Sequence, residues 1–263
     1  MLRFAVIIAS LFVLSSCATA PHVSPLARAD LAPTGTLRVG INFGNVLLTA
    51  KDPATGEPRG VAPDLARELG RRLGVPIEIV PYSTAGRMAD AVTTGAWDVA
   101  FLGAEPQRAN EISFTAPYAE IEASYLVPPG SPLRTVEDVD RAGVRIALAE
   151  KSAYDLYLTR NLKRAQLVRA PNTPAAFKLF VDDRLEAHAN LRPVLLTFVD
   201  KLPGSRILEG RFSVVGQAVG TPKGREAGAK YLREFVEDAK VSGLVAQTIE
   251  RNGIRGLNVA PAR

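Results

Sequence analysis

The 263-residue chain is 47% hydrophobic and 22% charged, fractions that exclude a disordered, collagen-like or coiled-coil protein and allow one large domain or two smaller ones. Its formal net charge of +5 is not gathered in basic runs interleaved with aromatic residues, so we expect no nucleic-acid partner. The single cysteine excludes a disulfide-built fold. The sequence lacks the His-x-x-x-His spacing of a metal site, and we expect neither a metal nor another cofactor.

The N-terminus has the pattern of a secretory signal. Arg3 is followed by an apolar run from Phe4 to Leu14, which is shorter than the roughly 20 residues needed to span a bilayer. Leu14-Ser15-Ser16-Cys17 resembles the lipobox of bacterial lipoproteins, whose cysteine is diacylated and becomes the mature N-terminus. The alternative is an ordinary signal peptide with a chance cysteine, but an exposed thiol is a liability in an oxidising compartment. We therefore expect a signal peptide over 1–16 and a periplasmic protein anchored to a membrane through Cys17, with the choice between inner and outer membrane open.

The segment that follows the cysteine has the composition of a linker. Residues 17–35 include three prolines and show no hydrophobic period. Such segments are typically extended and do not pack. We expect a flexible tether between the membrane and the folded body.

The first half of the body alternates short apolar strands with amphipathic helices. Strands are predicted over 37–41, 77–80 and 99–102, and helices over 63–73 and 84–94. Pro63 opens the first helix and a glycine ends each of the two. This strand–helix alternation predicts a parallel sheet with right-handed crossovers.

The second half repeats this alternation. Further strands are predicted over 144–148, 166–168 and 186–190, with helices opening at Thr135, Ser152, Thr173 and Pro193 and a C-terminal helix over 226–251. Two successive α/β units predict two lobes. Ligands of open α/β sheets bind beyond the carboxyl ends of the strands, so we expect the site in the cleft between the lobes.

Five motifs in a fixed order carry a resemblance to a known family. They are Leu37-Arg38-Val39-Gly40, the segment Gly60–Ala66, Gly95-Ala96-Trp97-Asp98-Val99, Pro106-Gln107-Arg108-Ala109 together with Phe114–Tyr118, and Lys151-Ser152. From about Leu37 to Gly253, their order resembles the family 3 solute-binding proteins of ABC transporters, the amino-acid-binding type. Each motif alone is common, whereas the order and spacing of all five are specific.

The resemblance implies a type II periplasmic-binding-protein fold, an α/β architecture of two lobes joined by two crossing strands. The crossings would lie near 121–124 and 214–217. Lobe 1 would then comprise 36–123 plus 214–259, and lobe 2 would comprise 124–213. The resemblance further implies a monomer, not an enzyme, that captures a small solute and presents it to an ABC permease in the inner membrane.

The resemblance also assigns ligand-binding roles to individual residues. Arg108 falls on the arginine that clamps the ligand carboxylate, a task that suits the planar, always charged guanidinium. Ser152 falls on a serine that meets the same carboxylate at a helix start. The plain alternatives are a solvated arginine and an ordinary helix cap. Gly103 begins the loop that leads to the arginine, and Asn45 stands where the family has an aromatic residue.

The chain departs from the family at the position that grips the ligand ammonium. Leu191 stands there instead of an aspartate, flanked by Asn190 and Arg192. A buried ammonium without a carboxylate costs several kcal/mol. We therefore expect Asn190 and Arg192 to contact a small polar or anionic solute, such as an organic acid or an amino-acid-like molecule, and not a standard zwitterionic amino acid.

Two alternatives of other classes stay open at this point. One is an enzyme of the same fold, such as a cyclohexadienyl-type dehydratase that uses Glu105 or Glu150 as acid and base. His188 is the only histidine of the predicted body, and a buried strand histidine is the simpler interpretation of it. The other alternative is a ligand-sensing lipoprotein that serves no permease.

Overall fold

A computed structural model describes residues 23–263. The predicted signal peptide and the predicted lipid anchor, Cys17, lie outside the described residues. Among residues 23–263, no helix has the length and apolar character that crossing a membrane requires.

The first lobe is built on three parallel strands. β1 (Leu37–Asn42) pairs with β4 (Ile77–Tyr82) on one side and with β5 (Val99–Gly103) on the other. Helix α2 (Val61–Leu73) and helix α3 (Ala85–Asp90) connect these strands in sequence, which is the predicted order. All five residues of β5 are buried, as its continuous apolar run predicts for a strand that is covered on both faces.

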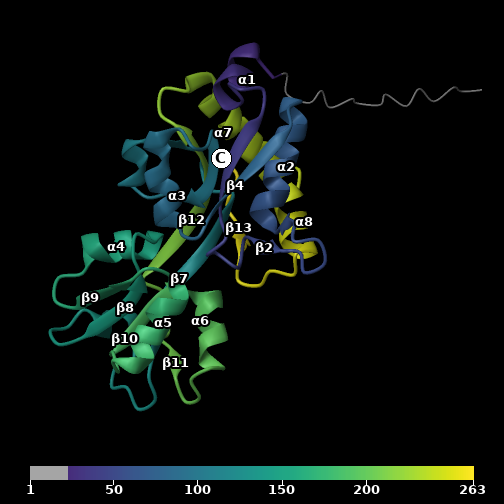
Figure 1. Cartoon of the computed structure of the whole chain (residues 1–263). Helices are drawn as coiled ribbons and strands as arrows, with labels where there is room; N and C mark the ends of the chain where they lie inside the picture. Colours follow the sequence, from purple (N-terminus) through teal and green to yellow (C-terminus); the bar gives the residue numbers. More distant parts are fainter. Residues whose placement is uncertain (1–22) are drawn as a thin grey trace, which may run out of the picture.

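The second lobe repeats this plan with its own strands. β8 (Arg145–Ala149) pairs in parallel with β9 (Gln166–Ala170) and with β10 (Ala187–Leu191). The helices of this lobe are α4 (Ala153–Asn161), α5 (Thr173–Asp182) and α6 (Arg192–Val199). In Figure 1 they form the green lower body, with α4 on its left and α6 on its right.

Two long strands connect the lobes. β7 (Ala119–Val127) and β12 (Ser213–Pro222) pair in antiparallel over 119–123 and 213–217. Beyond this overlap β12 pairs with β5 of lobe 1, and β7 pairs with β10 of lobe 2. The sheet therefore runs from one lobe to the other in the order β4-β1-β5-β12-β7-β10-β8-β9, and Figure 1 shows β7 and β12 passing between the two bodies.

Short elements and a broken C-terminal helix complete the chain. Where the sequence predicts one helix over 226–251, the structure has α7 (Glu226–Val241) and α8 (Leu244–Arg251). They are separated at Gly243, whose φ of 78° a glycine adopts without strain. The remaining elements are β2 (Ala50–Lys51), β3 (Pro58–Arg59), η1 (Ala91–Thr94), η2 (Arg108–Asn110), β6 (Ile112–Phe114), η3 (Val136–Val139), β11 (Arg206–Ile207) and β13 (Asn258–Val259).

The prediction of a flexible tether over 17–35 is wrong for residues 25–31, which form helix α1 (Pro25–Leu31). Ser24 caps this helix by accepting a hydrogen bond from the N–H of Ala27, and Pro25 occupies its first turn, where the missing N–H has no intrahelical partner to lose. Ala27 and Leu31 are buried, and α1 packs on α7 at the top of lobe 1 (Figure 1). The described chain is therefore part of the folded body from its start.

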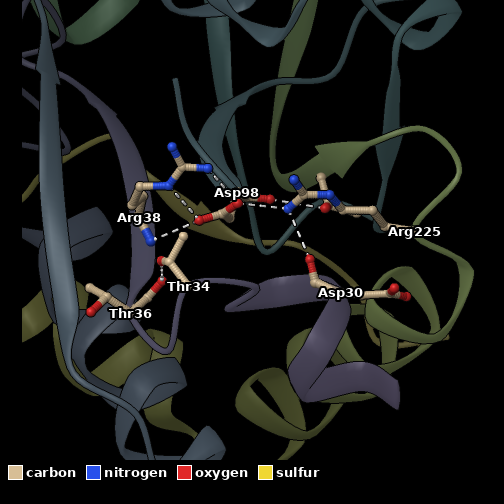
Figure 2. A network of polar contacts seen from close by, with 7 residues as sticks. Asp30, Thr34, Thr36, Arg38, Asp98 and Arg225 are labelled. Atoms are coloured by element: carbon tan, nitrogen blue, oxygen red, sulfur yellow. Dashed lines mark hydrogen bonds and ion pairs between the residues drawn. The ribbon is translucent and has the colours of Figure 1, made fainter. Parts of the chain in front are cut away.

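A buried carboxylate fastens this N-terminal helix to the sheet, as Figure 2 shows. Asp98 is fully buried and accepts hydrogen bonds from the guanidinium groups of Arg38 and Arg225. Arg225 also donates to the carbonyl oxygen of Asp30 in α1. Burial alone would raise the pKa of Asp98, but the hydrogen bonds from both arginines outweigh it and hold this pKa below its usual value.

Candidate functional site

Residues of both lobes enclose a cavity of about 560 Å³. Lobe 1 contributes residues between 42 and 49, between 83 and 85, and between 101 and 103. Lobe 2 contributes the β8–α4 turn, the start of α5 and one face of α6. Much of this wall is apolar, with Phe43, Phe101, Tyr154 and Phe198 as its aromatic members. A cavity of this size and composition is typical of a small-molecule site.

Arg108 is the buried cation of this cavity. Only 6% of it is exposed, and its guanidinium donates to the carbonyl oxygens of Gly103 (2.7 Å) and Lys151 (2.8 Å). Burial lowers the pKa of Arg108 to about 10, so the side chain is still charged at neutral pH. Within residues 23–263 it forms no ion pair with a carboxylate. The carboxylates of Glu105 and Asp90 lie near enough to favour the charged form of Arg108, but neither forms an ion pair with it. A buried cation without a directly bonded carboxylate makes this end of the cavity attractive to an anion.

Ser152 lies beside this cation at the start of α4. Its Oγ accepts a hydrogen bond from the N–H of Asp155 at 3.1 Å, which makes it the N-cap of the helix. The residue also lines the cavity. The structure therefore shows the helix cap directly and brings the same residue to the predicted site.

Three more predicted residues line the cavity. A Cβ at Gly103 would lie 3.0 Å from a methyl group of Val215 and 3.2 Å from the Cβ of Ala153, so the glycine permits close packing at this wall. Asn45 accepts a hydrogen bond from the N–H of Leu47. The amide oxygen of Asn190 accepts one from the N–H of Leu191 at 2.8 Å, so part of its bonding capacity is already used.

Arg192 does not reach the cavity. Its guanidinium lies 3.1 Å from the Glu122 carboxylate and donates to the carbonyl oxygens of Leu208 and Gly210. β10 ends at Leu191 and α6 begins at Arg192, and this change of backbone direction carries the side chain toward β7. Asn45 stands where the family has an aromatic residue, and the nearby Tyr82 does not replace that ring, because it lies outside the cavity wall and packs against a small cluster that contains Met88.

Several polar residues of the cavity lie outside the predicted ligand-binding set, and Glu150, Lys201 and Thr49 are the ones that bear on ligand chemistry. Glu150 and Lys201 line the cavity and are exposed. Thr49 also lines it, is 3% exposed, and its hydroxyl has no hydrogen-bond partner among the described residues. Each lies in a loop or just past a helix end, where hydrophobic periodicity gives no signal.

Two ion pairs connect the lobes beside the cavity. Lys151 of lobe 2 reaches Asp90 of lobe 1 at 2.6 Å, and this hydrogen bond raises the pKa of the lysine. Arg160 of α4 reaches Glu105 of lobe 1, also at 2.6 Å. The Arg108 hydrogen bond to the Lys151 carbonyl crosses the same gap. The structure therefore has its lobes in contact along the side of the cleft where α3 faces α4.

His188 lies in the core of lobe 2 and not in the cavity wall. His188 is fully buried beside Phe177, Phe180 and Phe198, and its Nδ1 lies 3.2 Å from the carbonyl oxygen of Ala147. Burial lowers the pKa of His188 to about 4, and the residue is not part of the cavity wall. Over the described range 23–263, no group of three or more potential ligand side chains could hold a metal ion.

Residues 37–253 match the bacterial extracellular solute-binding proteins, family 3. The chain belongs to this family. Proteins of family 3 bind small ligands and work with ABC permeases. The resemblance drawn from the five motifs is therefore confirmed. The family places the protein in the periplasm or outside the cell, whereas lipid attachment rests on the sequence pattern alone.

Individual relatives include both binding proteins and an enzyme. The chain is 25% identical to the cyclohexadienyl dehydratase of Pseudomonas aeruginosa, over 92% of this chain and 91% of the relative. An ancestral amino acid-binding protein, described as a precursor of cyclohexadienyl dehydratase, is 22% identical with a TM-score of 0.71, covering 87% of this chain and 99% of that one.

A third relative is a transport protein with a bound ligand. It is an amino acid ABC transporter substrate-binding protein from Streptococcus pneumoniae bound to L-arginine, which is 20% identical with a TM-score of 0.71. The match covers 86% of this chain and 98% of that one. At this identity the structural neighbours show the fold alone, and with the sheet order they confirm the predicted two-lobed α/β class.

Proposed function

We propose that this family 3 protein captures a small solute bearing a carboxylate in its inter-lobe cavity and delivers it to an ABC importer. The observation that carries the proposal is Arg108, a buried cation that lines the cavity without a carboxylate partner among the described residues. Its two donated hydrogen bonds to carbonyl oxygens fix the guanidinium in place. A positioned, desolvated guanidinium is well suited to a carboxylate, which it can meet with two parallel hydrogen bonds.

The rest of the cavity favours an organic acid over a standard α-amino acid. Leu191 brings an apolar side chain to the wall, and the neighbouring Asn190 amide is held by the backbone and lies near His188. Glu150 is the one carboxylate among the cavity-lining residues, all of which are described, and it is exposed. A ligand ammonium would therefore depend on Glu150 alone, in a position where water screens the interaction.

A screen of the folded body tests this proposal directly. Amino acids, organic acids and small peptides are added to the purified body, and hits in thermal unfolding are titrated by calorimetry. A ligand at a hundredfold excess over its Kd stabilises the protein by ~2.7 kcal/mol, so binders are readily detected. We expect hits among carboxylates. A hit set of neutral or cationic solutes only would refute the proposed site chemistry.

The Glu150→Gln variant then separates the two ligand classes. For an organic acid, removing this exposed carboxylate leaves the affinity unchanged or raises it slightly, because a negative charge leaves the site. For a zwitterionic amino acid, the same change weakens binding. Micromolar binding of a common α-amino acid that is lost in Glu150→Gln would overturn our ligand assignment while leaving the binding function in place.

We further propose that the protein is anchored through Cys17 and serves a permease. Labelling of the expressed protein with a fatty acid, lost in Cys17→Ser, tests the anchor. Uptake of the radiolabelled hit by cells with and without the gene tests transport, and a permease–ATPase gene pair beside it would support the same conclusion. Unchanged uptake in the deletion strain would favour a ligand-sensing lipoprotein instead.

A dehydratase is the second candidate function, favoured by the similarity to the Pseudomonas aeruginosa enzyme. Of the candidate carboxylates, Glu150 is the one that lines the cavity, whereas Glu105 is paired with Arg160 and His188 is buried elsewhere. Incubation with prephenate and with arogenate, followed by detection of an aromatic product, tests this activity. Turnover that is lost in Glu150→Gln would establish the enzyme, and binding of either compound without turnover would reject it.

A further inference from the structure

The cavity has a second cation, Lys201, which comes from the other lobe than Arg108. Val194, Thr197 and Phe198 of α6 line the cavity, followed by Lys201 just after the helix. Residues spaced by three, four and seven positions lie on one face of a helix. At 1.5 Å per residue the helix rises roughly 8 Å from Val194 to its end at Val199. Lys201 continues this turn, because its backbone N–H donates to the carbonyl oxygen of Phe198. The stripe therefore forms an apolar wall that ends in an ammonium group.

The two cations approach the cavity from different sides. Arg108 is bonded to the turn that opens α4, whereas Lys201 follows the end of α6. Figure 1 shows α4 and α6 on opposite sides of lobe 2. The wall of the cavity is largely apolar and includes Leu191 and Val215. A ligand that reaches both cations from these two sides must be elongated, and an apolar middle suits this wall.

Lys201 is available for such a ligand. Its Nζ lies 5.4 Å from the centroid of the Phe198 ring, which itself lines the cavity. The contact holds the ammonium over an aromatic face without neutralising its charge. In the part of the chain that the structure describes, Lys201 makes no ion pair with a carboxylate, its sequence neighbour Asp200 included.

We propose that Lys201 is a specificity-determining residue that recognises a second anionic group at the far end of the ligand. The ligand class is then a carboxylate with an apolar spacer and a terminal acid, of which the linear α,ω-dicarboxylates are the simplest members. This inference rests on the proposed function, because it assumes that the first carboxylate binds at Arg108. It adds a length requirement that a single-carboxylate site does not have.

Calorimetric titration of two acid series tests the inference. Linear dicarboxylates of four to ten carbons are compared with monocarboxylates of equal length on the wild-type protein. We expect one dicarboxylate length to bind about tenfold more tightly than its matched monocarboxylate, as a charge-assisted contact at a partly solvated site allows. Lys201→Met should remove this preference, whereas Lys201→Arg should retain it.

Lys163→Met is the matched control, since Lys163 is an exposed lysine of lobe 2 outside the cavity wall. It should keep the dicarboxylate preference. Equal affinity for both series in the wild type, or a preference that survives in Lys201→Met, would overturn the role of Lys201 while leaving carboxylate capture at Arg108 intact. Failure of the proposed function is a different result, in which no carboxylate of the wider screen binds at all.

Discussion

We predict that the ion pair between Glu105 and Arg160 stabilises the closed state of the cleft. Glu105 belongs to lobe 1 and is 8% exposed, whereas the Arg160 side chain belongs to lobe 2 and is 38% exposed. Replacing Arg160 by methionine leaves the Glu105 carboxylate buried without its partner whenever the lobes are in contact. When the lobes separate, water can hydrate that carboxylate, so the penalty applies to the closed state alone.

The magnitude follows from the burial of the two partners. Breaking a fully buried pair costs about 3–5 kcal/mol and breaking an exposed one about 0–1 kcal/mol. Since one partner is buried and the other is partly solvated, we take about 2 kcal/mol for Arg160→Met. A ligand that binds the closed state must supply this free energy, so its Kd should rise about 30-fold.

Calorimetric titration of four proteins provides the assay. The wild type and Arg164→Met, an exposed arginine of the same lobe without an inter-lobe contact, should bind the ligand equally. Arg160→Met should bind about 30-fold more weakly. The double variant Arg160→Met/Glu105→Gln lacks the unpaired buried carboxylate and should recover most of the affinity. A Kd of Arg160→Met within twofold of the wild-type Kd would refute the reasoning, and so would a double variant that binds no more tightly than Arg160→Met.

Two further predictions concern stability. Asp98→Asn should lower the free energy of unfolding by about 3 kcal/mol at pH 7, because both arginines in Figure 2 lose their buried counter-ion. The difference in unfolding free energy between the wild type and Asp98→Asn should shrink below about pH 4, since the folded pKa of Asp98 lies under its ordinary value of 3.8 and its contribution is lost on protonation. Chemical denaturation at pH 7 and below pH 4 measures both effects, with the surface variant Asp182→Asn as control. His188, with its pKa lowered from 6.5 to about 4, is buried neutral, so the unfolded chain binds the extra proton as the pH falls through this window. The wild type should therefore lose about 2 kcal/mol between pH 7 and pH 5 from this group, a loss absent in His188→Phe, and equal pH slopes for the two proteins would contradict it.

The sequence predicted the elements that rest on strong local signals. Thr84 and Ser152 cap helices as expected, and the buried run at β5 reads as a strand from its apolar residues alone. Helix α1 was missed because seven residues form no stable helix by themselves. Its stability comes from packing on α7 and from the bonds to Asp30, which join segments nearly 200 positions apart.

In the candidate site, too, residues in recognisable motifs could be predicted from the sequence, and residues outside such motifs could not. Arg108 and Ser152 were found because they stand in motifs with a fixed order, and the structure brings both to the cavity. Arg192 was placed there by its proximity to Leu191 in sequence, but its side chain turns toward Glu122 where the helix begins. Lys201 carries no motif, and only the face that α6 presents to the cleft reveals it.

The central claim is that Arg108 binds the carboxylate of the captured solute. The most direct measurement is calorimetric titration of the best carboxylate hit and of its primary amide against the wild type, Arg108→Met and Arg192→Met. We predict that the wild type and Arg192→Met bind the acid about 100-fold more tightly than the amide, and that Arg108→Met shows no such preference. An acid that binds Arg108→Met as tightly as it binds the wild type would contradict the account.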